Sequence, residues 1–490
     1  MRTDIRLKDR YAEILSYTGL ILAISGMLVL TPLLSLPSYP EESVHGMGFF
    51  LPAALLSGTG VGLWRGFRRQ AAVSLSVQEG GIVVLLSWVI VLLFSAWPYM
   101  AAEKWRFTQA FFESVSGWTT TGLTVVDYEK ATHLTFLWRS ITQLAGGAGL
   151  AIIMLAAIAG PVGAGVTLAE GRSDQLAPHV RDSAKLVLVI YSGYALAGIL
   201  AYRMAGMSFF DAVNHTFPAI STGGFSTRVE SIGYWDSPVI EAVTLVLMFF
   251  GNMNFLTAYL LLQGKLKAVY RNGEMRVMAT VTPIFALAVF FLVCRNLYPS
   301  LSKSVRVAIF ETFSALTTTG FSTVSYSNWN SFGVLALVIL MLIGGGTGST
   351  AGGIKQYRVY ILFKSLLWEL RGSFLPGTAV IKNYVWQGEL KAYVQDSRIR
   401  QVANFVFLYL VTFFLGAGIL AAHGYSLQES LFEFASAVGT VGLSVGVTAY
   451  DAPAGVLWTE IVGMFLGRLE FIVIFVSAAR IVRDSYAMLR

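Results

Sequence analysis

The stretch Ala315-Leu316-Thr317-Thr318-Thr319-Gly320-Phe321-Ser322 lies between two long apolar segments and is too polar to continue either of them as a membrane helix. Its core, Thr-x-Gly followed by Leu or Phe, occurs four times in the chain. The copies are Thr120-Thr121-Gly122-Leu123, Thr222-Gly223-Gly224-Phe225, Thr318-Thr319-Gly320-Phe321 and Thr440-Val441-Gly442-Leu443. Because the copies are widely and similarly spaced, we interpret them as one unit repeated four times.

The residues that flank the four motifs repeat in the same register. A glutamate preceded by Phe lies nine residues before the last glycine in three copies, at Glu113, Glu311 and Glu433, and His215 takes this place in the second copy. Thr or Ser follows each motif, at Thr124, Ser226, Ser322 and Ser444. Two interpretations of the glutamates stay open: they brace the loops from behind, or they raise the local concentration of cations.

Composition indicates a protein that crosses a membrane several times. Of the 490 residues, 55% are hydrophobic and only 13% are charged, and the mean hydropathy is +0.64. Soluble domains carry about a quarter charged residues. The first apolar segment, Ile14–Leu36, is too long for the apolar part of a signal peptide, so we expect no cleavable signal. Cys294 is the one cysteine, which excludes a disulfide within one chain.

Apolar segments of about 20 residues, the length that crosses a bilayer, alternate with the motifs. We predict an all-α membrane protein with ten transmembrane helices. Two N-terminal helices precede four pseudo-fourfold repeats, each made of a helix, a pore helix with its loop, and a second helix, as in potassium channels. The predicted units are 1–78 (the two-helix extension), 79–183, 184–276, 277–398 and 399–490.

The predicted elements have the following bounds. The spans are Ile14–Leu36, Phe49–Leu63, Gly81–Tyr99, Phe136–Ala159, Ala184–Tyr202, Val239–Leu262, Val277–Leu297, Phe332 to about Leu367, Gln401–Ala422 and Val456–Ile481. The short re-entrant segments are 107–125, 209–227, 307–323 and 427–445.

Lys and Arg gather in alternate loops, and this asymmetry predicts the orientation in the membrane. Basic residues occur near the N-terminus and within 65–69, 172–185, 265–276, 364–400 and 480–490, whereas the loop 37–47 has two glutamates and neither Lys nor Arg. We predict that both termini are cytoplasmic and that the four motifs lie toward the outer side. The net charge of +7 then follows from topology and requires no nucleic-acid partner.

One cytoplasmic stretch has strand character. Thr378–Gln395 contains two partly alternating segments around Gln387-Gly388, which predicts a small hairpin. Two interpretations stay open: a tethered loop, or a docking surface for a cytosolic partner.

The four motifs have the chemistry of a cation filter. Non-helical backbone persists at membrane depth only where it lines a cavity, and a potassium ion sheds water only where several carbonyl oxygens replace it. Thr favours extended backbone, and Gly permits the positive φ that an inward carbonyl requires. The predicted potassium-binding residues are Thr120, Thr121, Gly122, Thr222, Gly223, Gly224, Thr318, Thr319, Gly320, Thr440, Val441 and Gly442.

Glycines also interrupt the span that follows each filter. They lie at Gly146-Gly147, Gly251, Gly344–Gly353 and Gly467, and the third set is too rich in glycine for a continuous helix. A phosphate-binding loop is excluded there, because Ile354 separates Gly353 from Lys355. We predict a gate below the filter, and the alternative is close helix packing through small residues. The predicted gate residues are Gly344, Gly345, Gly346, Thr347, Gly348, Ser349, Thr350, Ala351, Gly352, Gly353 and Arg468.

Arg468 lies in the middle of an apolar segment, where a charge is costly and faces a cavity or a partner. We predict that it donates to carbonyl groups of the glycine-rich loop and sets a barrier to cations. The alternative is a structural ion pair with a carboxylate elsewhere.

Together these residues resemble the Trk/Ktr/HKT superfamily of potassium transport proteins, and most of all its TrkH/TrkG branch. The resemblance covers nearly the whole chain. It is carried by Gly-Gly-Phe-Ser at 223–226 after His215, Thr-Thr-Thr-Gly-Phe at 317–321, the run 344–355 and Gly467-Arg468-Leu469-Glu470. One departure is Gly439, where the other copies have Ser or Thr before the motif, and this departure implies weaker selectivity among potassium, rubidium and sodium.

The resemblance implies a homodimeric potassium uptake subunit of the bacterial inner membrane, surrounded by membrane lipid. It also implies a cytosolic, nucleotide-binding regulatory subunit of the TrkA type. Potassium is the ion expected on this chain, with no organic cofactor. The alternatives are a proton- or sodium-coupled potassium symporter and a less selective monovalent cation channel. The chain has no HExxH and no Gly-x-Ser-x-Gly, so we do not expect an enzyme.

Overall fold

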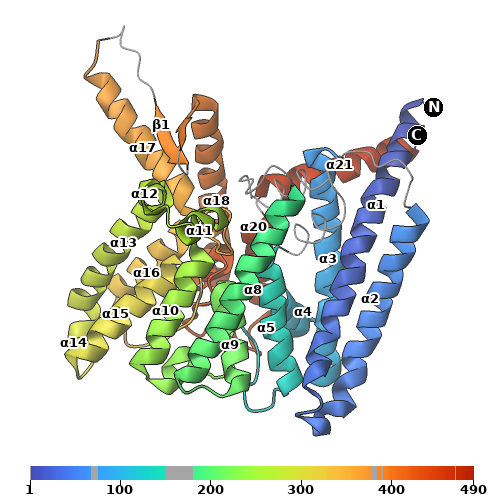
Figure 1. The fold of residues 1–490 in the computed structure, drawn as a ribbon, viewed down its shortest axis with the longest axis horizontal. Helices are drawn as coiled ribbons and strands as arrows, with labels where there is room; N and C mark the ends of the chain where they lie inside the picture. Colours follow the sequence, from blue (N-terminus) through green and yellow to red (C-terminus); the bar gives the residue numbers. More distant parts are fainter. Residues whose placement is uncertain are drawn as a thin grey trace.

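The computed structural model describes residues 2–67, 75–149, 180–376, 383–387, 390–469 and 471–489, and its regular structure is almost entirely helical (Figure 1). Within those residues, six helices are long and apolar enough to cross a membrane. The number is eight if each of two sharply bent helix pairs is taken as one span. The predicted helical fold is therefore confirmed, whereas the number of ten spans stays a prediction.

Two long helices form the N-terminal extension. They are α1 (Arg2–Val29) and α2 (Gly46–Phe67), joined through the 3₁₀ turns η1 (Thr31–Ser35) and η2 (Pro40–His45). The two helices approach closely because small residues face each other: a Cβ on Gly19 would overlap the backbone of Gly60. The first predicted span, Ile14–Leu36, agrees at its end with the apolar helical segment Leu7–Ser35, which continues α1 through η1, whereas the helix itself begins earlier, at Arg2.

Each repeat opens with a long helix. These helices are α3 (Val77–Ala102), α8 (Val180–Met204), α13 (Gly273–Val289) and α18 (Asp396–Ala422). The π-helical turn η5 (Phe290–Cys294) and α14 (Arg295–Leu297) continue α13. A short helix follows each long one: α4 (Phe107–Trp118), α9 (Phe209–Ile220), α15 (Leu301–Leu316) and α19 (Leu427–Gly439).

The short helices begin where the sequence supplies a cap. The hydroxyl groups of Ser208, Ser300 and Ser426 accept hydrogen bonds from the third backbone N–H of α9, α15 and α19. The prediction for the third repeat was wrong by six residues at its start, because α15 begins after Ser300 and not at 307. All four short helices end immediately before a Thr-x-Gly motif, as predicted.

In the second, third and fourth repeats the second helix is broken, as predicted. In the second repeat α10 (Pro238–Asn252) and α11 (Phe255–Leu262) differ in direction by 113°, and in the fourth α20 (Ala454–Leu469) and α21 (Phe471–Leu489) differ by 98°. In the third, α16 (Ser331–Ile343) is separated from α17 (Gln356–Ser373) by the glycine-rich loop. In the first, α5 (His133–Ala148) is followed by Gly149, and the predicted continuation to Ala159 lies outside the described residues.

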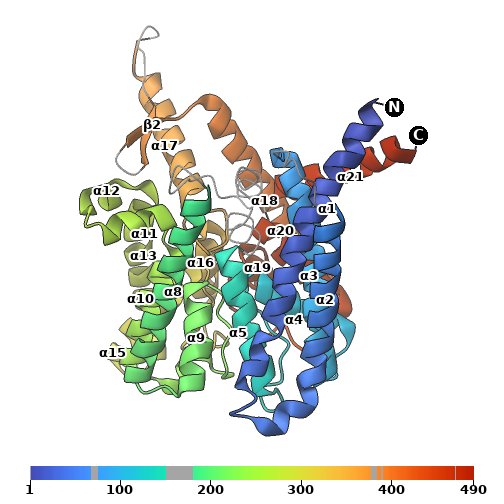
Figure 2. The ribbon, with the colours of Figure 1, turned by 45° about the vertical axis from the view of Figure 1, so that its right-hand side comes forward.

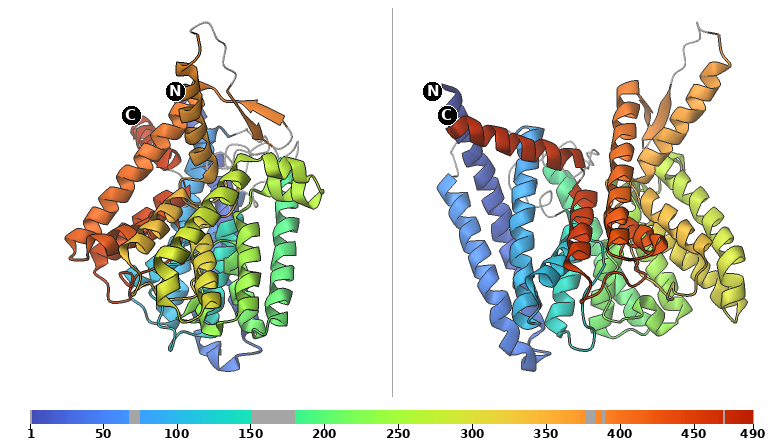
Figure 3. Two further views of the ribbon diagram at one scale, coloured as in Figure 1. Left: turned by 90° about the vertical axis from the view of Figure 1, so that its left-hand side faces the viewer. Right: turned by 180° about the vertical axis from the view of Figure 1, so that it is seen from behind.

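Strands β1 (Tyr384–Gln387) and β2 (Leu390–Tyr393) pair antiparallel, with Gln387 opposite Leu390, so the predicted hairpin is confirmed. It projects beyond the helical body together with α17 (Figure 2). Both termini lie at this same end of the molecule, and α21 runs across it (Figure 3). The connecting elements η4 (Ser231–Trp235) and α12 (Leu266–Arg271) complete the described structure.

Candidate functional site

The four Thr-x-Gly loops share one unusual backbone conformation. The first threonine of each motif has a positive φ of 50° to 56°, at Thr120, Thr222, Thr318 and Thr440. The last glycine of each motif also has a positive φ, between 72° and 100°, at Gly122, Gly224, Gly320 and Gly442. A positive φ is strained for a β-branched residue and persists only where its surroundings impose it. Its fourfold recurrence shows that all four loops adopt the same turn.

The loops meet in a closed ring. A Cβ on Gly122 would overlap the carbonyl oxygen of Gly223, and one on Gly224 would overlap that of Thr319. In the same way, a Cβ on Gly320 would overlap the carbonyl oxygen of Val441, and one on Gly442 would overlap that of Thr121. Each loop therefore touches the next through the same two motif positions, and the fourth returns to the first. Eight of the twelve predicted filter residues, the second and third of each motif, thus meet in this ring.

Three of the four loops are held by the helix before them, through a position that sequence reasoning missed. Six residues before the last glycine, Ser116 and Ser436 accept hydrogen bonds from the N–H groups of Gly122 (3.1 Å) and Gly442 (2.9 Å). The hydroxyl of Ser314 donates to the carbonyl of Phe321 (2.6 Å). The spacing of the serines repeats along the chain and was the available signal.

The second repeat has Pro218 at this position, and a side chain from α5 replaces the missing hydroxyl. Gln143 donates through Nε2 to the carbonyl of Gly223 (2.6 Å) and accepts from the N–H of Phe225 (3.1 Å). The loop is therefore braced in all four repeats, but in the second repeat by a residue of the first.

The residues nine before the glycine support the segment that follows each loop. Glu113 accepts from the N–H of Val125 (3.0 Å), and Glu311 accepts from that of Thr323 (2.8 Å). Glu433 and His215 occupy the equivalent places and contact Val445 and Ser226. None of these four side chains is exposed. They support the loops from behind and do not face solution.

Arg139 is a functional candidate that sequence reasoning missed. Its Nε lies 2.7 Å from a carboxylate oxygen of Glu113, and both side chains are buried. Its Nη1 donates to the carbonyl of Ser226 (2.9 Å), and its guanidinium lies 4.0 Å from the ring centre of Phe225. Arg139 therefore ties the first loop to the second. An arginine within the apolar segment Phe136–Ala159 was the signal that could have found it.

The glycine-rich loop lies directly against the ring. The N–H of Gly352 donates to the hydroxyl of Thr318 (2.7 Å), and the hydroxyl groups of Thr350 and Thr222 are 3.1 Å apart. A Cβ on Gly352 would overlap the hydroxyl oxygen of Thr440. The predicted gate residues Gly344–Gly353 are thus brought together with the first threonine of three of the four motifs.

Arg468 holds this loop. It donates through Nη1 to the carbonyl of Thr350 (2.7 Å), as predicted from the sequence. It also donates through Nη2 to the carbonyl of Gly146 at the end of α5 (2.6 Å), a contact that was not predicted. One side chain of the fourth repeat thereby joins the third repeat to the first.

The donor set is that of an oxygen-lined pathway. Among the residues that the structure describes, no group of three or more His, Cys, Asp or Glu is arranged to hold a metal ion. The hydroxyl oxygens of Thr120 and Thr440 are buried and have no hydrogen-bond partner. Orphaned hydroxyl oxygens and crowded backbone carbonyls suit a weakly bound alkali cation better than a tightly held divalent one.

Comparison with known proteins agrees with this geometry. The TrkH family model, described as a cation transport protein, matches residues 46–487. An uncharacterised cation transporter of Methanocaldococcus jannaschii is 30% identical over 97% of both chains. The Trk system potassium uptake protein TrkH of Escherichia coli strain K12 is 32% identical over 93% of this chain and 96% of its own.

A solved structure is also similar. The crystal structure of the potassium transporter TrkH from Vibrio parahaemolyticus superposes with a TM-score of 0.82 at 29% identity, covering 95% of this chain and 97% of that one. Members of this family are membrane ion transporters, not enzymes. On the family match over residues 46–487 and the full-length relatives, this chain belongs to the TrkH family of cation transport proteins.

Proposed function

We propose that the ring of four Thr-x-Gly loops is the selectivity filter of a gated, channel-like pathway for potassium uptake across the cytoplasmic membrane. The observation that carries this proposal is the closed cycle of contacts between the same motif positions in all four repeats. The names of the relatives agree with it, since the E. coli homologue is a potassium uptake protein and the solved homologue a potassium transporter.

In this proposal backbone carbonyl and threonine hydroxyl oxygens replace the water around the ion. The filter residues are Thr120, Thr121, Gly122, Thr222, Gly223, Gly224, Thr318, Thr319, Gly320, Thr440, Val441 and Gly442. The C-terminal ends of the four short helices meet the loops, and their partial negative charge favours a cation. The membrane potential draws the ion inward with about 2.3 kcal/mol per 100 mV for each unit charge.

The glycine-rich loop Gly344–Gly353 and Arg468 act as the gate. The loop occupies the position directly below the filter threonines, and the guanidinium of Arg468 adds a positive charge there. The alternative, close helix packing through small residues, is weaker. The hydroxyl of Thr350 donates to the carbonyl of Gly251 (2.9 Å), and the carbonyl of Thr350 accepts from Arg468. Packing through small residues requires neither bond.

The wider assembly is proposed on the same basis. Ten spans, cytoplasmic termini and an inner-membrane location fit the basic loops and the common end at which termini and hairpin lie. We propose a homodimer that binds a cytosolic regulatory subunit of the TrkA type, with the β1–β2 hairpin as one docking surface.

A second candidate function is proton-coupled potassium symport, and one observation favours it. Glu433 and Glu460 are both buried, and both contact Thr448: its N–H donates to Glu433 (2.9 Å) and its hydroxyl to Glu460 (3.1 Å). Two neighbouring carboxylates in a dry interior favour holding a proton. Measuring flux against pH at fixed voltage separates the two functions, since a channel-like pathway carries current without moving protons.

The decisive experiment is ion flux into proteoliposomes that contain this chain alone. At equal driving force we expect potassium and rubidium to enter faster than sodium, and sodium faster than lithium, because the carbonyl cage replaces the hydration of the larger ions better. Equal rates for all four ions would remove the filter assignment and leave an unselective cation channel.

A further inference from the structure

The break between α10 and α11 lies alongside the glycine-rich loop. The N–H of Gly346 donates to the side-chain oxygen of Asn252 (3.0 Å), and the side-chain amide of Asn254 donates to the carbonyl of Thr347. The N–H of Thr350 donates to the carbonyl of Gly251 (3.3 Å). Backbone groups at the broken helix and in the loop therefore satisfy one another.

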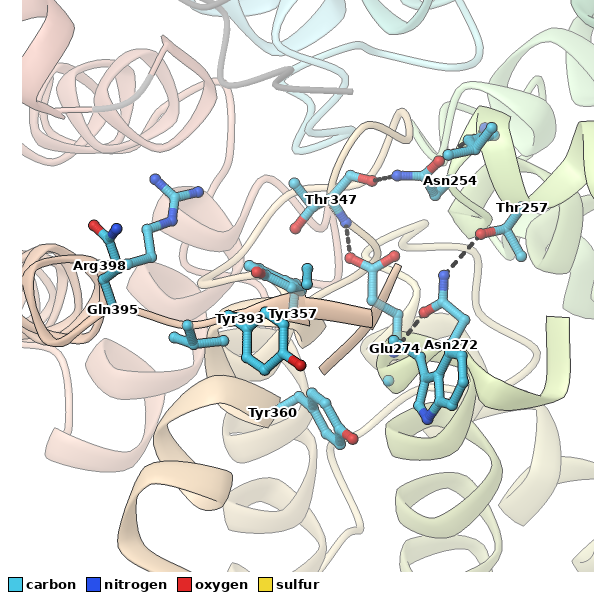
Figure 4. A pocket seen from close by; sticks show the side chains of 15 residues that line it. Asn254, Thr257, Asn272, Glu274, Thr347, Tyr357, Tyr360, Tyr393, Gln395 and Arg398 are labelled. Carbon is cyan, nitrogen blue, oxygen red and sulfur yellow. Dashed lines mark hydrogen bonds between the residues drawn. The ribbon is translucent and has the colours of Figure 1, made fainter. Parts of the chain in front are cut away.

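Glu274 adds a charged contact to the same part of the loop. Its carboxylate accepts a hydrogen bond from the N–H of Thr347 at 2.6 Å, and the residue is only 6% exposed (Figure 4). Hydrogen bonds to an ionised acceptor are about twice as strong as neutral ones. This contact is therefore a charge-assisted bond from α13 to the backbone of the loop.

The carboxylate is fixed in place by its own helix start. Asn272 caps α13 by accepting from the N–H of Glu274 (2.8 Å), and its side-chain amide donates to the hydroxyl of Thr257 on α11 (2.9 Å). Figure 4 shows these bonds in one chain of contacts from α11 through Asn272 to Glu274. The carboxylate thus holds the loop from a base formed by two helices.

The loop depends on such external contacts. Gly344, Gly348 and Gly353 adopt positive φ values of 71°, 70° and 76°, so the loop cannot be held by a helix of its own. Arg468 contacts it from the fourth repeat, and the residues Asn252, Asn254 and Glu274 contact it from the second and third. The loop is held from two sides.

A pocket of about 300 Å³ lies beside Glu274. Its walls include Thr347 of the loop, Tyr357 and Tyr360 of α17, and Trp386 and Tyr393 of the hairpin. Glu274 therefore lines a pocket that it shares with the glycine-rich loop and the hairpin.

We propose that Glu274 is a positioning residue that latches the glycine-rich loop in the position seen here, with Asn252 and Asn254 as the neutral part of the latch. This inference rests on the proposed gating function. Releasing the latch frees the inner half of the loop while the filter ring stays intact. The latch thus sets how often the pathway opens and leaves unchanged which ion it prefers.

The test compares Glu274→Ala, Glu274→Gln and a matched control in proteoliposomes. The control is Glu241→Gln, a buried carboxylate at the opposite end of α10 that pairs with Arg306. We expect Glu274→Ala to raise basal potassium flux on the order of tenfold, as loss of a charge-assisted bond implies. Glu274→Gln, which keeps the shape of the side chain but removes its charge, should raise basal potassium flux less. The control Glu241→Gln should leave the flux unchanged. The potassium-to-sodium ratio should stay at the parental value in all three.

A second measurement does not depend on flux. Ser349, only 4% exposed in the loop, is changed to Cys in a Cys294→Ser background, and its reaction with a water-soluble thiol reagent is timed. Glu274→Ala should accelerate this reaction, because the freed loop exposes residue 349. Parental flux and parental reaction rate in Glu274→Ala would overturn the latch.

A variant with a shortened Gly344–Gly353 loop separates failure of the latch from failure of the gate. If shortening raises basal flux and Glu274→Ala does not, the gate stands and the latch is wrong. If neither variant changes flux, the proposed gating function is wrong, and the latch proposal, which rests on it, is wrong as well.

Discussion

The ring of loops and the layer directly below it differ in symmetry. In the ring, four loops share the same φ pattern, and each touches the next through equivalent atoms. In the layer below, the helix breaks of the second, third and fourth repeats, which the structure describes, are unequal. The third repeat has a long glycine-rich loop, the fourth supplies Arg468, and the second supplies Asn252 and Asn254.

This difference separates two physical requirements. A dehydrated ion needs similar oxygen atoms on all sides, so every repeat must keep the same loop geometry. A device that opens and closes needs one movable part and several fixed ones, so the repeats must differ. On the proposed function, the chain meets both requirements by keeping Thr-x-Gly in all four copies while the residues about 25 positions later differ from repeat to repeat.

The largest effect is expected where the ring itself is broken. Gly320→Val should reduce potassium uptake to background, because the added side chain would overlap the carbonyl of Val441 and the φ of +80° suits only glycine. The amount of protein in the membrane should stay unchanged. Uptake by cells and the membrane content of the variant are both measured.

The control for this variant is Gly62→Val, since nothing lies within 4 Å of a Cβ on Gly62 in α2. Parental uptake in Gly320→Val, with normal membrane content, would mean that the ring is not the ion pathway.

A smaller effect is expected in the asymmetric layer. Arg468→Ala removes two hydrogen bonds, to the carbonyls of Thr350 and Gly146, and should raise basal flux on the order of tenfold. Arg468→Lys should give a basal flux between those of the parental protein and Arg468→Ala, because a single ammonium group lacks the planar guanidinium fork that reaches both carbonyls. Flux through both variants is compared at equal voltage; a fall in either one would indicate that Arg468 keeps the pathway open.

Substituting the buried residues that support the ring should lower the stability of the fold more than it changes ion selectivity. Arg139→Ala leaves Glu113 charged and unpaired in a dry interior, which costs about 3–5 kcal/mol. Thermal unfolding of the purified protein measures the loss. Adding Glu113→Gln removes the buried charge and should restore part of the lost stability. A double variant as unstable as Arg139→Ala would contradict the pairing.

The smallest effect is expected outside the ring. The Lys303 ammonium and the Arg306 guanidinium lower the pKa of the Asp236 carboxyl, whose side chain is 63% exposed. A lowered pKa stabilises the fold above the ordinary value and loses this contribution as the pH falls through the folded value. Asp236→Asn should therefore cost less than about 1 kcal/mol at pH 7 and nothing in strong acid. A melting-temperature difference that grows in acid would contradict this sign.

Much of the site was predictable because its signals are local. The glutamate of each Phe-Glu pair lies nine residues before the last glycine of a Thr-x-Gly motif, and the glycine runs follow that glycine by about 25 residues. Boundaries were less predictable: α15 starts at Leu301 because Ser300 caps it, and α1 starts at Arg2, ahead of the apolar segment.

What the sequence by itself determined is the helical membrane fold and the places of the four Thr-x-Gly turns, because hydropathy, β-branched threonine and glycine act on the backbone where they stand. Only the tertiary structure decided the partners. Arg468 donates to a carbonyl 322 positions away in the sequence. Gln143 hydrogen-bonds a loop 80 positions away, in the one repeat where Pro218 stands in place of the serine of the other repeats. Such pairs form because buried polar groups must find partners, and which partner each one finds depends on how the four repeats close into a ring.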